Sequence, residues 1–516
     1  MIDTRAFASA PEGRGRFHGL AVFALLFAVT VAVRLPFINI VHDDEAFFAV
    51  ISQRWLQGEW PYAASFDVKP PLIFVVLALA QAVFGMHIWV VKLVEILAIA
   101  LGALGIFELT ARFRPGHAGL WASLLYIGFS LPMMGVYFPV QSIQMALTVW
   151  AMVEAVKAQK AENRVSLCLS GAYIGLAVLS KQTAAFEALA LMIWLAVSAK
   201  PSQGFKTLTI WSLSAAVPIL LCLIAFALAG YGQALIQDAG FLAMARAGFG
   251  HGTVATIGPF GIVTRLITFC LAVFPLTALL VGGTLFARAR PQLLQATDPK
   301  LTWLLPLWLG FIVLGMFSCV FIDVWYAVPL IAPCVIMTGL VIEHVLPLPT
   351  GRRVGVQILL VVAVIAATLA ANQQTLIIKG ARNAPDIQAA QHAALKLRAL
   401  GMKRGDSLLI PIRGYSIYFF TGNMPQTPYF SAGHLVCDSP TPSQDPLGEA
   451  LDSRPKYIVM PNTRLKLGCA IGSHVARISG RLATDYDLIG DVGGTWDQFY
   501  IYRRRSRDLS LAYMLN

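Results

Sequence analysis

Charged side chains are scarce in this chain of 516 residues. They make up 13% of the sequence, whereas hydrophobic residues make up 57%, and the mean hydropathy is +0.69. Soluble proteins average about 25% charged residues. The shortage leaves many uncharged runs near the length of about 20 residues that crosses a bilayer. The composition therefore predicts an α-helical polytopic membrane protein.

The sequence also lacks the common motifs for binding nucleotides and zinc. It has no P-loop, GxGxxG, HExxH or GxSxG context, and no CxxC or Cys/His spacing. If the protein catalyses a group transfer, the activated donor of that group is therefore not a bound nucleotide and would have to arrive through the membrane. Cys437 and Cys469 lie in the polar C-terminal part, where an oxidising compartment would permit a disulfide.

The formal net charge of +12 does not come from a basic binding patch. Lys and Arg fall mostly in short loops between apolar runs, without the interleaved aromatics of a nucleic-acid site. This distribution sets membrane topology, and we expect no nucleic-acid partner.

About eleven apolar segments are candidates for membrane spans. The segments are 17–38, 88–112, 117–135, 140–156, 166–180, 184–198, 208–230, 259–287, 302–321, 326–345 and 354–372. Basic residues at alternate ends put the N-terminus in the cytoplasm. The run from Pro71 to Phe84 breaks this alternation and is too short to cross. We predict that it forms a juxtamembrane or re-entrant helix on the outer face, beginning at Pro70-Pro71.

The chain is expected to divide into a transmembrane domain and a small outer domain. The first would span residues 1–372 and contain an outer loop at 39–87. In 373–516, residues 386–401 have helical periodicity and end at a glycine, which is a helix-stop signal. Segments 407–412, 456–461, 486–492 and 498–504 have the pattern of strands. We therefore expect an extracytoplasmic α/β domain at the C-terminus.

The first outer loop carries three consecutive acids, Asp43, Asp44 and Glu45, and ends with Lys69 in FDVKPPL. A carboxylate beside the membrane suits a general base that takes a proton from an attacking hydroxyl. Adjacent acids also suit a divalent metal, or they simply face solvent. Lys69 suits a point charge for a phosphate, or a lysine that extends to the membrane surface.

Three further residues interrupt apolar sequence near the expected outer face. Lys181 in VLSKQTAAF and Arg265 are ionisable groups at a depth where charge is costly and usually functional. An ordinary loop position remains the alternative for Lys181. Tyr326 in DVWYAVPLIAP lies at an outer turn, where tyrosine either marks the interface or donates a hydrogen bond to a phosphate.

The stretches DDEAFFAVISQRWLQGEWPY, FDVKPPLIF, VLSKQ and DVWYAVPLIAP together resemble one family over about residues 17–345. This family is the bacterial GT-C fold glycosyltransferases that depend on polyprenyl-phosphate sugars, the glycosyltransferase family 39 group. Its relatives include lipid A aminoarabinose transferases and rhizobial-type galacturonosyl transferases. The resemblance implies a multi-pass protein of the bacterial inner membrane, with its active site and C-terminal domain facing the periplasm.

The resemblance also implies roles for individual residues. Asp44 would be the catalytic base in an inverting transfer, with Asp43 as fallback in the acid run that Glu45 completes. The phosphate of the polyprenyl-phosphate sugar donor would be bound by four residues: Lys69, Lys181, Arg265 and Tyr326. The acceptor would be a hydroxyl or a phosphate of a glycolipid, such as lipopolysaccharide core or lipid A. No cofactor is expected.

One departure from the family is a pair of glutamines. PVQSIQMAL has Gln141 and Gln144 where relatives often place an acid, which counts against a bound metal at the acid run. Two other functions stay open. One is a transporter or flippase for a lipid-linked sugar, although we find no internal repeat of the kind many transporters have. The other is a protein O-glycosyltransferase.

Overall fold

The computed structural model describes most of the chain. The described residues are 12–40, 42–114, 116–134, 139–161, 163–242, 299–317, 324–344, 389–412, 414–430, 445–461, 471–493 and 498–505, with scattered positions in 267–285 and 355–366. The chain forms two compact units. The first comprises Met1–Asn39, Val68–Phe249 and Pro259–Gly380, and the second comprises Ile40–Asp67, Gly250–Gly258 and Ala381–Asn516.

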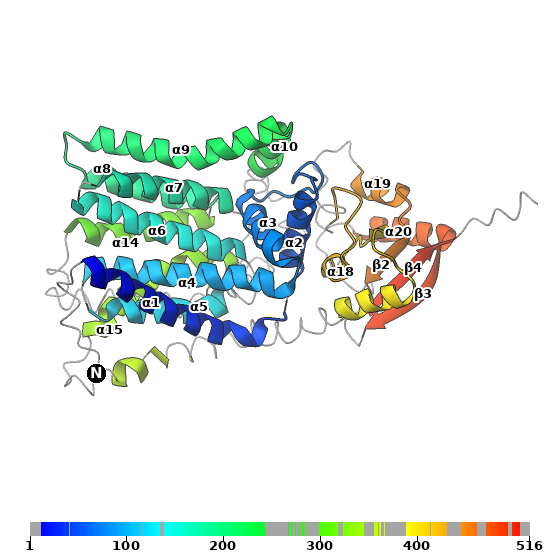
Figure 1. Cartoon of the computed structure of the whole chain (residues 1–516), viewed down its shortest axis with the longest axis horizontal. Helices are drawn as coiled ribbons and strands as arrows, with labels where there is room; N and C mark the ends of the chain where they lie inside the picture. Colours follow the sequence, from blue (N-terminus) through cyan, green and yellow to red (C-terminus); the bar gives the residue numbers. More distant parts are fainter. Residues whose placement is uncertain are drawn as a thin grey trace, which may run out of the picture. The chain divides into compact units, whose positions relative to one another are not determined.

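The first unit consists of helices, and its long helices run side by side (Figure 1). Its helices are α1 (Glu12–Arg34), η2 (Leu35–Phe37), α3 (Leu72–Phe84), α4 (Ile88–Phe113), α5 (Ala118–Met134), α6 (Pro139–Ala161), α7 (Arg164–Ser180), α8 (Ala184–Ser198), α9 (Gly204–Leu228), α10 (Gly232–Leu235), the π-helix η3 (Ile236–Leu242), α14 (Pro299–Phe317), η4 (Val324–Leu330) and α15 (Ile331–His344). The helix α6 packs between α4 and α7, and α7 packs against α9.

The apolar helices agree with the expected membrane spans. Within the described residues, four helical segments are long and apolar enough to cross a bilayer: Gly19–Phe37, Ile88–Phe113, Gly204–Leu228 and Tyr326–Glu343. Shorter apolar helices are Leu72–Phe84, Ala118–Leu131, Arg164–Ser180, Ala184–Ser198 and Lys300–Met316. The expected spans at 259–287 and 354–372 lie largely outside the described residues.

The short helix α3 was predicted from the sequence as a separate element. It has 13 residues, and its N-cap is Pro71. The prolines before it fit the start of a helix, where a backbone N–H would have no partner. The existence and start of this helix are confirmed, and its placement on the outer face stays a prediction.

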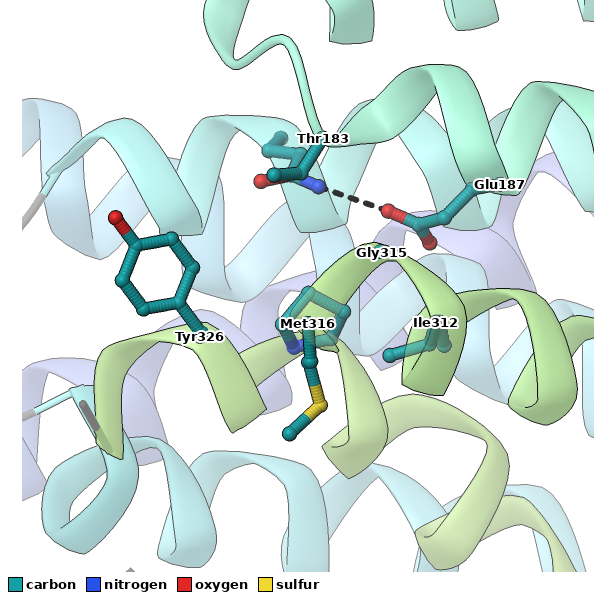
Figure 2. Close-up of a pocket in the computed structure, with 8 residues that line it drawn as sticks. Thr183, Glu187, Ile312, Gly315, Met316 and Tyr326 are labelled. Carbon is teal, nitrogen blue, oxygen red and sulfur yellow. Dashed lines mark hydrogen bonds between the residues drawn. The ribbon is translucent and has the colours of Figure 1, made fainter. Parts of the chain in front are cut away.

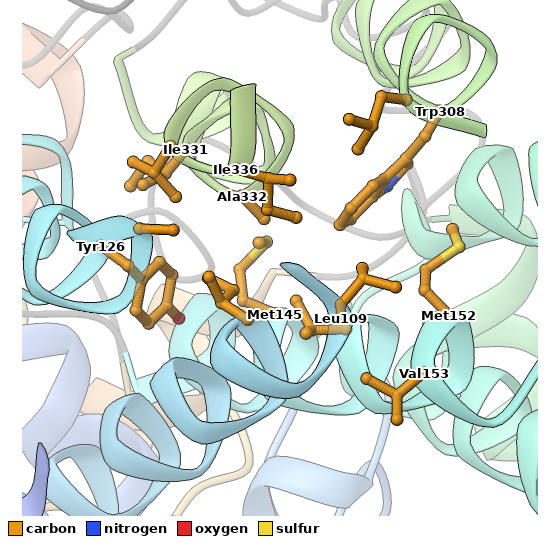
Figure 3. Packing of buried hydrophobic residues seen from close by; sticks show 14 of the residues in the cluster. Leu109, Tyr126, Met145, Met152, Val153, Trp308, Ile331, Ala332 and Ile336 are labelled. Carbon is orange, nitrogen blue, oxygen red and sulfur yellow. The ribbon is translucent and has the colours of Figure 1, made fainter. Parts of the chain in front are cut away.

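Large side chains and close backbone contacts hold the helices together. Trp308, Tyr126, Met145 and their neighbours fill the space between the helices (Figure 3). At the contact of α7 with α9, Gly175 lets the backbones approach. A Cβ at Gly175 would lie 2.2 Å from the carbonyl oxygen of Ala215. Small residues of this kind allow close packing of membrane helices.

A buried ion cluster joins α1, α4 and α5. Arg34 Nη1 lies 2.9 Å from Glu95 Oε1, and Lys92 Nζ lies 3.9 Å from Glu95 Oε2. Arg34 Nη2 also donates to the carbonyl oxygen and the hydroxyl of Ser130. All three charged side chains are at most 4% exposed. The carboxylate of Glu95 therefore offsets charge that would be costly inside the helices.

The second unit contains a four-stranded sheet in the order β1-β2-β4-β3. The strands are β1 (Leu408–Leu409), β2 (Tyr457–Pro461), β3 (Tyr486–Gly493) and β4 (Gln498–Arg504). β1 and β2 pair in parallel, and the other pairs are antiparallel. The unit also contains α2 (Asp43–Leu56), a helix over 389–399, α18 (Ser416–Thr421), α19 (Pro446–Asp452) and α20 (Ile471–Asp485).

All four predicted strands and the predicted helix before Gly401 are present, so the expectation of a small α/β domain is confirmed. Gly401 has φ +89°, a conformation that glycine adopts without strain. The expected boundary at 372/373 lies outside the described residues, as do Cys437 and Cys469.

Candidate active site

The side chain of Glu45 caps the N-terminus of helix α2. His42 Nδ1 accepts a hydrogen bond from the backbone N–H of Asp44 at 3.2 Å, and Glu45 Oε2 accepts one from the N–H of His42 at 2.9 Å. This reciprocal arrangement is a capping box, which satisfies backbone donors that a helix start leaves unpaired. Glu45 is 0% exposed. The side chain of Glu45 therefore has a structural task.

Asp43 accepts hydrogen bonds from residues in the C-terminal part of the same unit. Its Oδ1 accepts from the N–H of Ser416 at 3.3 Å and from the Ser416 hydroxyl at 3.0 Å, and its Oδ2 accepts from the N–H of Gly414 at 3.3 Å. The N-cap residue of α18, Tyr415, makes no side-chain capping hydrogen bond. Asp43 thus caps α18 from another part of the chain.

Asp44 is the acid that these contacts leave available. Its side chain is partly buried, and its carboxylate makes no hydrogen bond or ion pair with any residue that the structure describes. It lies in the first turn of α2, where the helix dipole favours a negative charge.

The three acids do not converge on one point. Asp43 and Glu45 each bind donors of the chain itself, and the described part of the chain holds no group of three or more His, Cys, Asp or Glu side chains placed around a metal ion. The carboxylates of Asp43 and Glu45 therefore have different partners within the chain.

Lys181 and Tyr326 meet in the first unit. Lys181 is the C-cap of α7, and its Nζ lies 4.6 Å from the centroid of the Tyr326 ring. The tyrosine comes from η4, which follows Lys181 by more than a hundred residues. A cation over an aromatic face is attracted by the negative charge of that face. This pair places an ammonium and a phenol hydroxyl in one region.

Gln182 joins the segment of Lys69 to the turn that carries Lys181. Its Nε2 donates to the carbonyl oxygen of Val68 at 2.8 Å and to that of Ala239 at 3.1 Å. Because Val68 precedes Lys69 and Gln182 follows Lys181, the two lysine segments lie side by side. Gln182 was not predicted as a site residue, and its only signal in the sequence is its place beside Lys181.

Beside Tyr326 the first unit contains a small cavity, with room for about one water molecule. It lies between α6, α8, α14 and η4 (Figure 2). Its lining residues are Gln144, Thr183, Glu187, Ile312, Gly315, Met316, Tyr326 and Pro329.

Glu187 is a buried carboxylate in this cavity. Its Oε1 accepts from Gln144 Nε2 at 2.8 Å, and its Oε2 accepts from Trp308 Nε1 at 2.7 Å. Glu187 is 1% exposed. Gln144 is one of the two predicted departures from the family pattern, whereas no role was predicted for Glu187. A carboxylate does stand beside Gln144, and it comes from α8.

The candidate residues divide between the two units. Lys69, Lys181 and Tyr326 belong to the first unit, whereas the three acids of α2 belong to the second. Arg265 lies outside the described residues.

Comparisons with known proteins place this arrangement in a fold. Residues 68–229 match the family model described as dolichyl-phosphate-mannose-protein mannosyltransferase, and this stretch contains Lys69 and Lys181. The structure of ArnT from Cupriavidus metallidurans bound to undecaprenyl phosphate matches with TM-score 0.61 and 14% identity, over 96% of this chain and 99% of that chain. The chain has the GT-C fold.

Two further solved structures agree with the GT-C fold. ArnT from Cupriavidus metallidurans in the apo state matches with TM-score 0.57 and 14% identity, over 93% of this chain and 97% of that chain. The apo oligosaccharyltransferase of Archaeoglobus fulgidus matches with TM-score 0.50 and 13% identity, over 86% of this chain and 69% of that chain. No curated protein sequence matches the chain.

Proposed function

We propose that this protein is a glycosyltransferase of the bacterial inner membrane. It moves a sugar from a polyprenyl-phosphate-linked donor to a hydroxyl of a glycolipid acceptor, such as lipopolysaccharide core or lipid A, at the periplasmic face. The observation that carries this proposal is the grouping of two lysine segments and Tyr326 by contacts between residues far apart in sequence. The match to the mannosyltransferase family model over 68–229 supports the same reaction class.

The cations bind and stabilise the donor phosphate. Lys69 and Lys181 supply positive charge, and the Tyr326 hydroxyl can donate a hydrogen bond to a phosphate oxygen. Arg265 is proposed for the same task from the sequence alone. Stabilising the charge that develops on a leaving group is usually a large part of catalysis.

Asp44 acts as the general base. Its carboxylate takes the proton of the acceptor hydroxyl, and that oxygen forms a bond to the anomeric carbon of the sugar. The bond from the anomeric carbon to the phosphate oxygen breaks, and the polyprenyl phosphate leaves with the bonding electrons. A single displacement of this kind inverts the anomeric carbon. The choice of Asp44 is supported by the engagement of its two neighbours elsewhere.

The test is transfer from radiolabelled polyprenyl-phosphate sugars by the full-length protein in proteoliposomes. Asp44→Asn is expected to lower transfer by a factor of about 10² to 10⁴ while donor binding remains, because a general base contributes that much. Asp43→Asn is expected to retain most activity, since its amide oxygen still accepts from Ser416. Full activity in both variants would show that neither Asp44 nor Asp43 is the base.

The phosphate site has its own test. Lys69→Ala and Lys181→Ala are expected to weaken binding of polyprenyl phosphate. Lys206→Ala, which removes an exposed lysine of α9, is the matched control. Unchanged binding in the first two variants would show that these lysines do not bind the phosphate. Lys69 would then be a lysine that extends to the membrane surface, and Lys181 an ordinary loop residue.

A protein acceptor is the second candidate, because the matching family model is named for protein mannosyltransferases. The same assay with a peptide and a glycolipid as competing acceptors separates the two candidates. Release of free polyprenyl phosphate separates both from a flippase, which would move the donor without cleaving it.

A further inference from the structure

The side chain of Gln182 connects two distant segments of the first unit to the turn of Lys181. Its Nε2 donates to the carbonyl oxygen of Val68 at 2.8 Å and to that of Ala239 at 3.1 Å. A side-chain amide nitrogen carries two hydrogens, so these two bonds use both of its donors. The amide therefore holds two backbone carbonyls against the turn between α7 and α8.

The turn that carries Gln182 is itself fixed by backbone hydrogen bonds. The N–H of Lys181 donates to the carbonyl oxygen of Ala177 at 2.9 Å, and the carbonyl oxygen of Lys181 accepts from the N–H of Ala184 at 3.0 Å. The carbonyl oxygen of Gln182 accepts from the N–H of Ala185 at 3.0 Å. Because α7 ends and α8 begins within these residues, the turn is a rigid base from which a side chain can position another segment.

The segment of Lys69 is restricted on both sides. On one side, the carbonyl oxygen of Val68 accepts from Gln182. On the other side, Pro70 and Pro71 follow, and a proline fixes its own φ angle and restricts the residue before it. The prolines therefore limit the direction of the chain after Lys69, and the amide of Gln182 sets the distance of this segment from the α7–α8 turn.

The second bond of the amide involves the end of η3. In a π-helix a carbonyl accepts from the N–H five residues further on. For Ala239 that N–H belongs to residue 244, beyond the last residue of η3, Leu242. Carbonyls in the last turn of a helix need a partner from outside the helix, and Gln182 is such a partner for Ala239. One side chain therefore joins the α7–α8 turn, the segment before α3 and η3.

We propose that Gln182 is a positioning residue for the phosphate site, and that its amide sets the spacing of Lys69 and Lys181 so that both ammonium groups reach one phosphate. Two cations in neighbouring segments repel each other, so a contact between the segments is needed to hold them together before an anion binds. A site that is arranged in advance loses less conformational entropy when its ligand binds. The inference rests on the proposed function, since it takes the two lysines as ligands of the donor phosphate.

The test is a double-mutant cycle on the detergent-purified full-length protein, with the affinity for polyprenyl phosphate as the measurement. Gln182→Met nearly keeps the length of the side chain but removes both donors, and should weaken binding about three- to tenfold, the usual value of one neutral hydrogen bond. In the Lys69→Ala background the same change should weaken binding less than about twofold, because residue 69 then has no ammonium to position. In the Lys181→Ala background the loss should persist.

Gln357→Met is the matched control. The Nε2 of Gln357 also donates to a backbone carbonyl, that of Ile342 at 3.1 Å, and this bond joins segments that contain neither lysine. Its loss should leave the affinity for polyprenyl phosphate unchanged. Gln182→Asn, whose amide is shorter by one methylene, replaces Gln182→Met in the cycle if that variant does not fold.

Each outcome decides the assignment. An equal loss from Gln182→Met with and without Lys69 would show a merely structural role for Gln182. A loss that disappears only in Lys181→Ala would show that Gln182 acts on the other lysine, and no loss in the wild-type background would show that the tie does not matter for binding. These three results overturn the inference and leave the proposed function standing. If Lys69→Ala alone binds polyprenyl phosphate as tightly as the wild type, the phosphate site of the proposed function fails, and the inference fails with it.

Discussion

The contact between Asp43 and α18 leads to a sharp prediction. Asp43→Ala removes three hydrogen bonds, to the N–H groups of Gly414 and Ser416 and to the Ser416 hydroxyl. The side chain of the N-cap residue Tyr415 makes no capping hydrogen bond that could replace those of Asp43. The start of α18 should then open more often than in the wild type.

The magnitude follows from the geometry. A hydrogen bond to a charged group contributes about 1.5–3 kcal/mol. Two of the three bonds are long, at 3.3 Å, and Asp43 is only partly buried. We therefore expect a total near the lower end, about 2 kcal/mol. This energy corresponds to a roughly 30-fold rise in local opening, since 1.36 kcal/mol is a factor of ten.

The assay is hydrogen–deuterium exchange of the full-length protein in detergent. Peptides that cover 414–421 should exchange roughly 30-fold faster in Asp43→Ala, and those from β4 should change little. Asp44→Asn is the matched control, because its carboxylate bonds to none of the described residues. Asp44→Asn should leave exchange at α18 unaltered and lower transfer by a factor of about 10² to 10⁴.

The two variants therefore separate a structural acid from a reacting one. Unaltered exchange of α18 in Asp43→Ala would show that Asp43 does not cap this helix. Asp43 would then be as available as Asp44 to act as the base. Faster exchange in Asp44→Asn would refute the choice of Asp44 equally, because it would give that carboxylate a structural partner.

Three further predictions concern stability. Glu95→Gln removes the carboxylate charge that lies beside the buried Arg34 and Lys92 side chains and should lower the free energy of unfolding by about 3–5 kcal/mol. Gly175→Ala should cost about 1–3 kcal/mol, because its Cβ would meet a carbonyl oxygen of α9, whereas a Cβ in the control Gly310→Ala enters open space and should be tolerated. Thermal unfolding in detergent measures the stability of these variants and of Glu95→Gln. Burial alone would raise the pKa of Asp406, but a backbone N–H and the Lys456 ammonium outweigh it and hold the pKa below its ordinary value. This contribution to stability is therefore present above about pH 4 and is lost as pH falls through the folded pKa, and Lys456→Met should reduce that acid sensitivity in circular dichroism.

The sequence by itself determined the class of protein and most of its elements. Scarce charge and apolar runs are local properties, so they identified membrane helices without any knowledge of packing. The strands of the C-terminal domain were recognisable because alternation and turn residues are also local. The short helix after Pro70-Pro71 was predicted for the same reason.

Only the tertiary structure separated the three acids of α2. Asp43, Asp44 and Glu45 are equivalent in the sequence as neighbouring carboxylates. Their difference comes from the partners they meet, and the partner of Asp43 lies 373 residues away at Ser416. A pattern of local residue types cannot contain such a contact.

The same reason applies to the cavity. Glu187 had no assigned role until α6 and α14 brought Gln144 and Trp308 to its two oxygens. Gln182 likewise had no role until it joined the segment of Lys69 to that of Lys181. The sequence supplied the reactive residue types, and the packing of distant helices decided which of them remain available for a ligand.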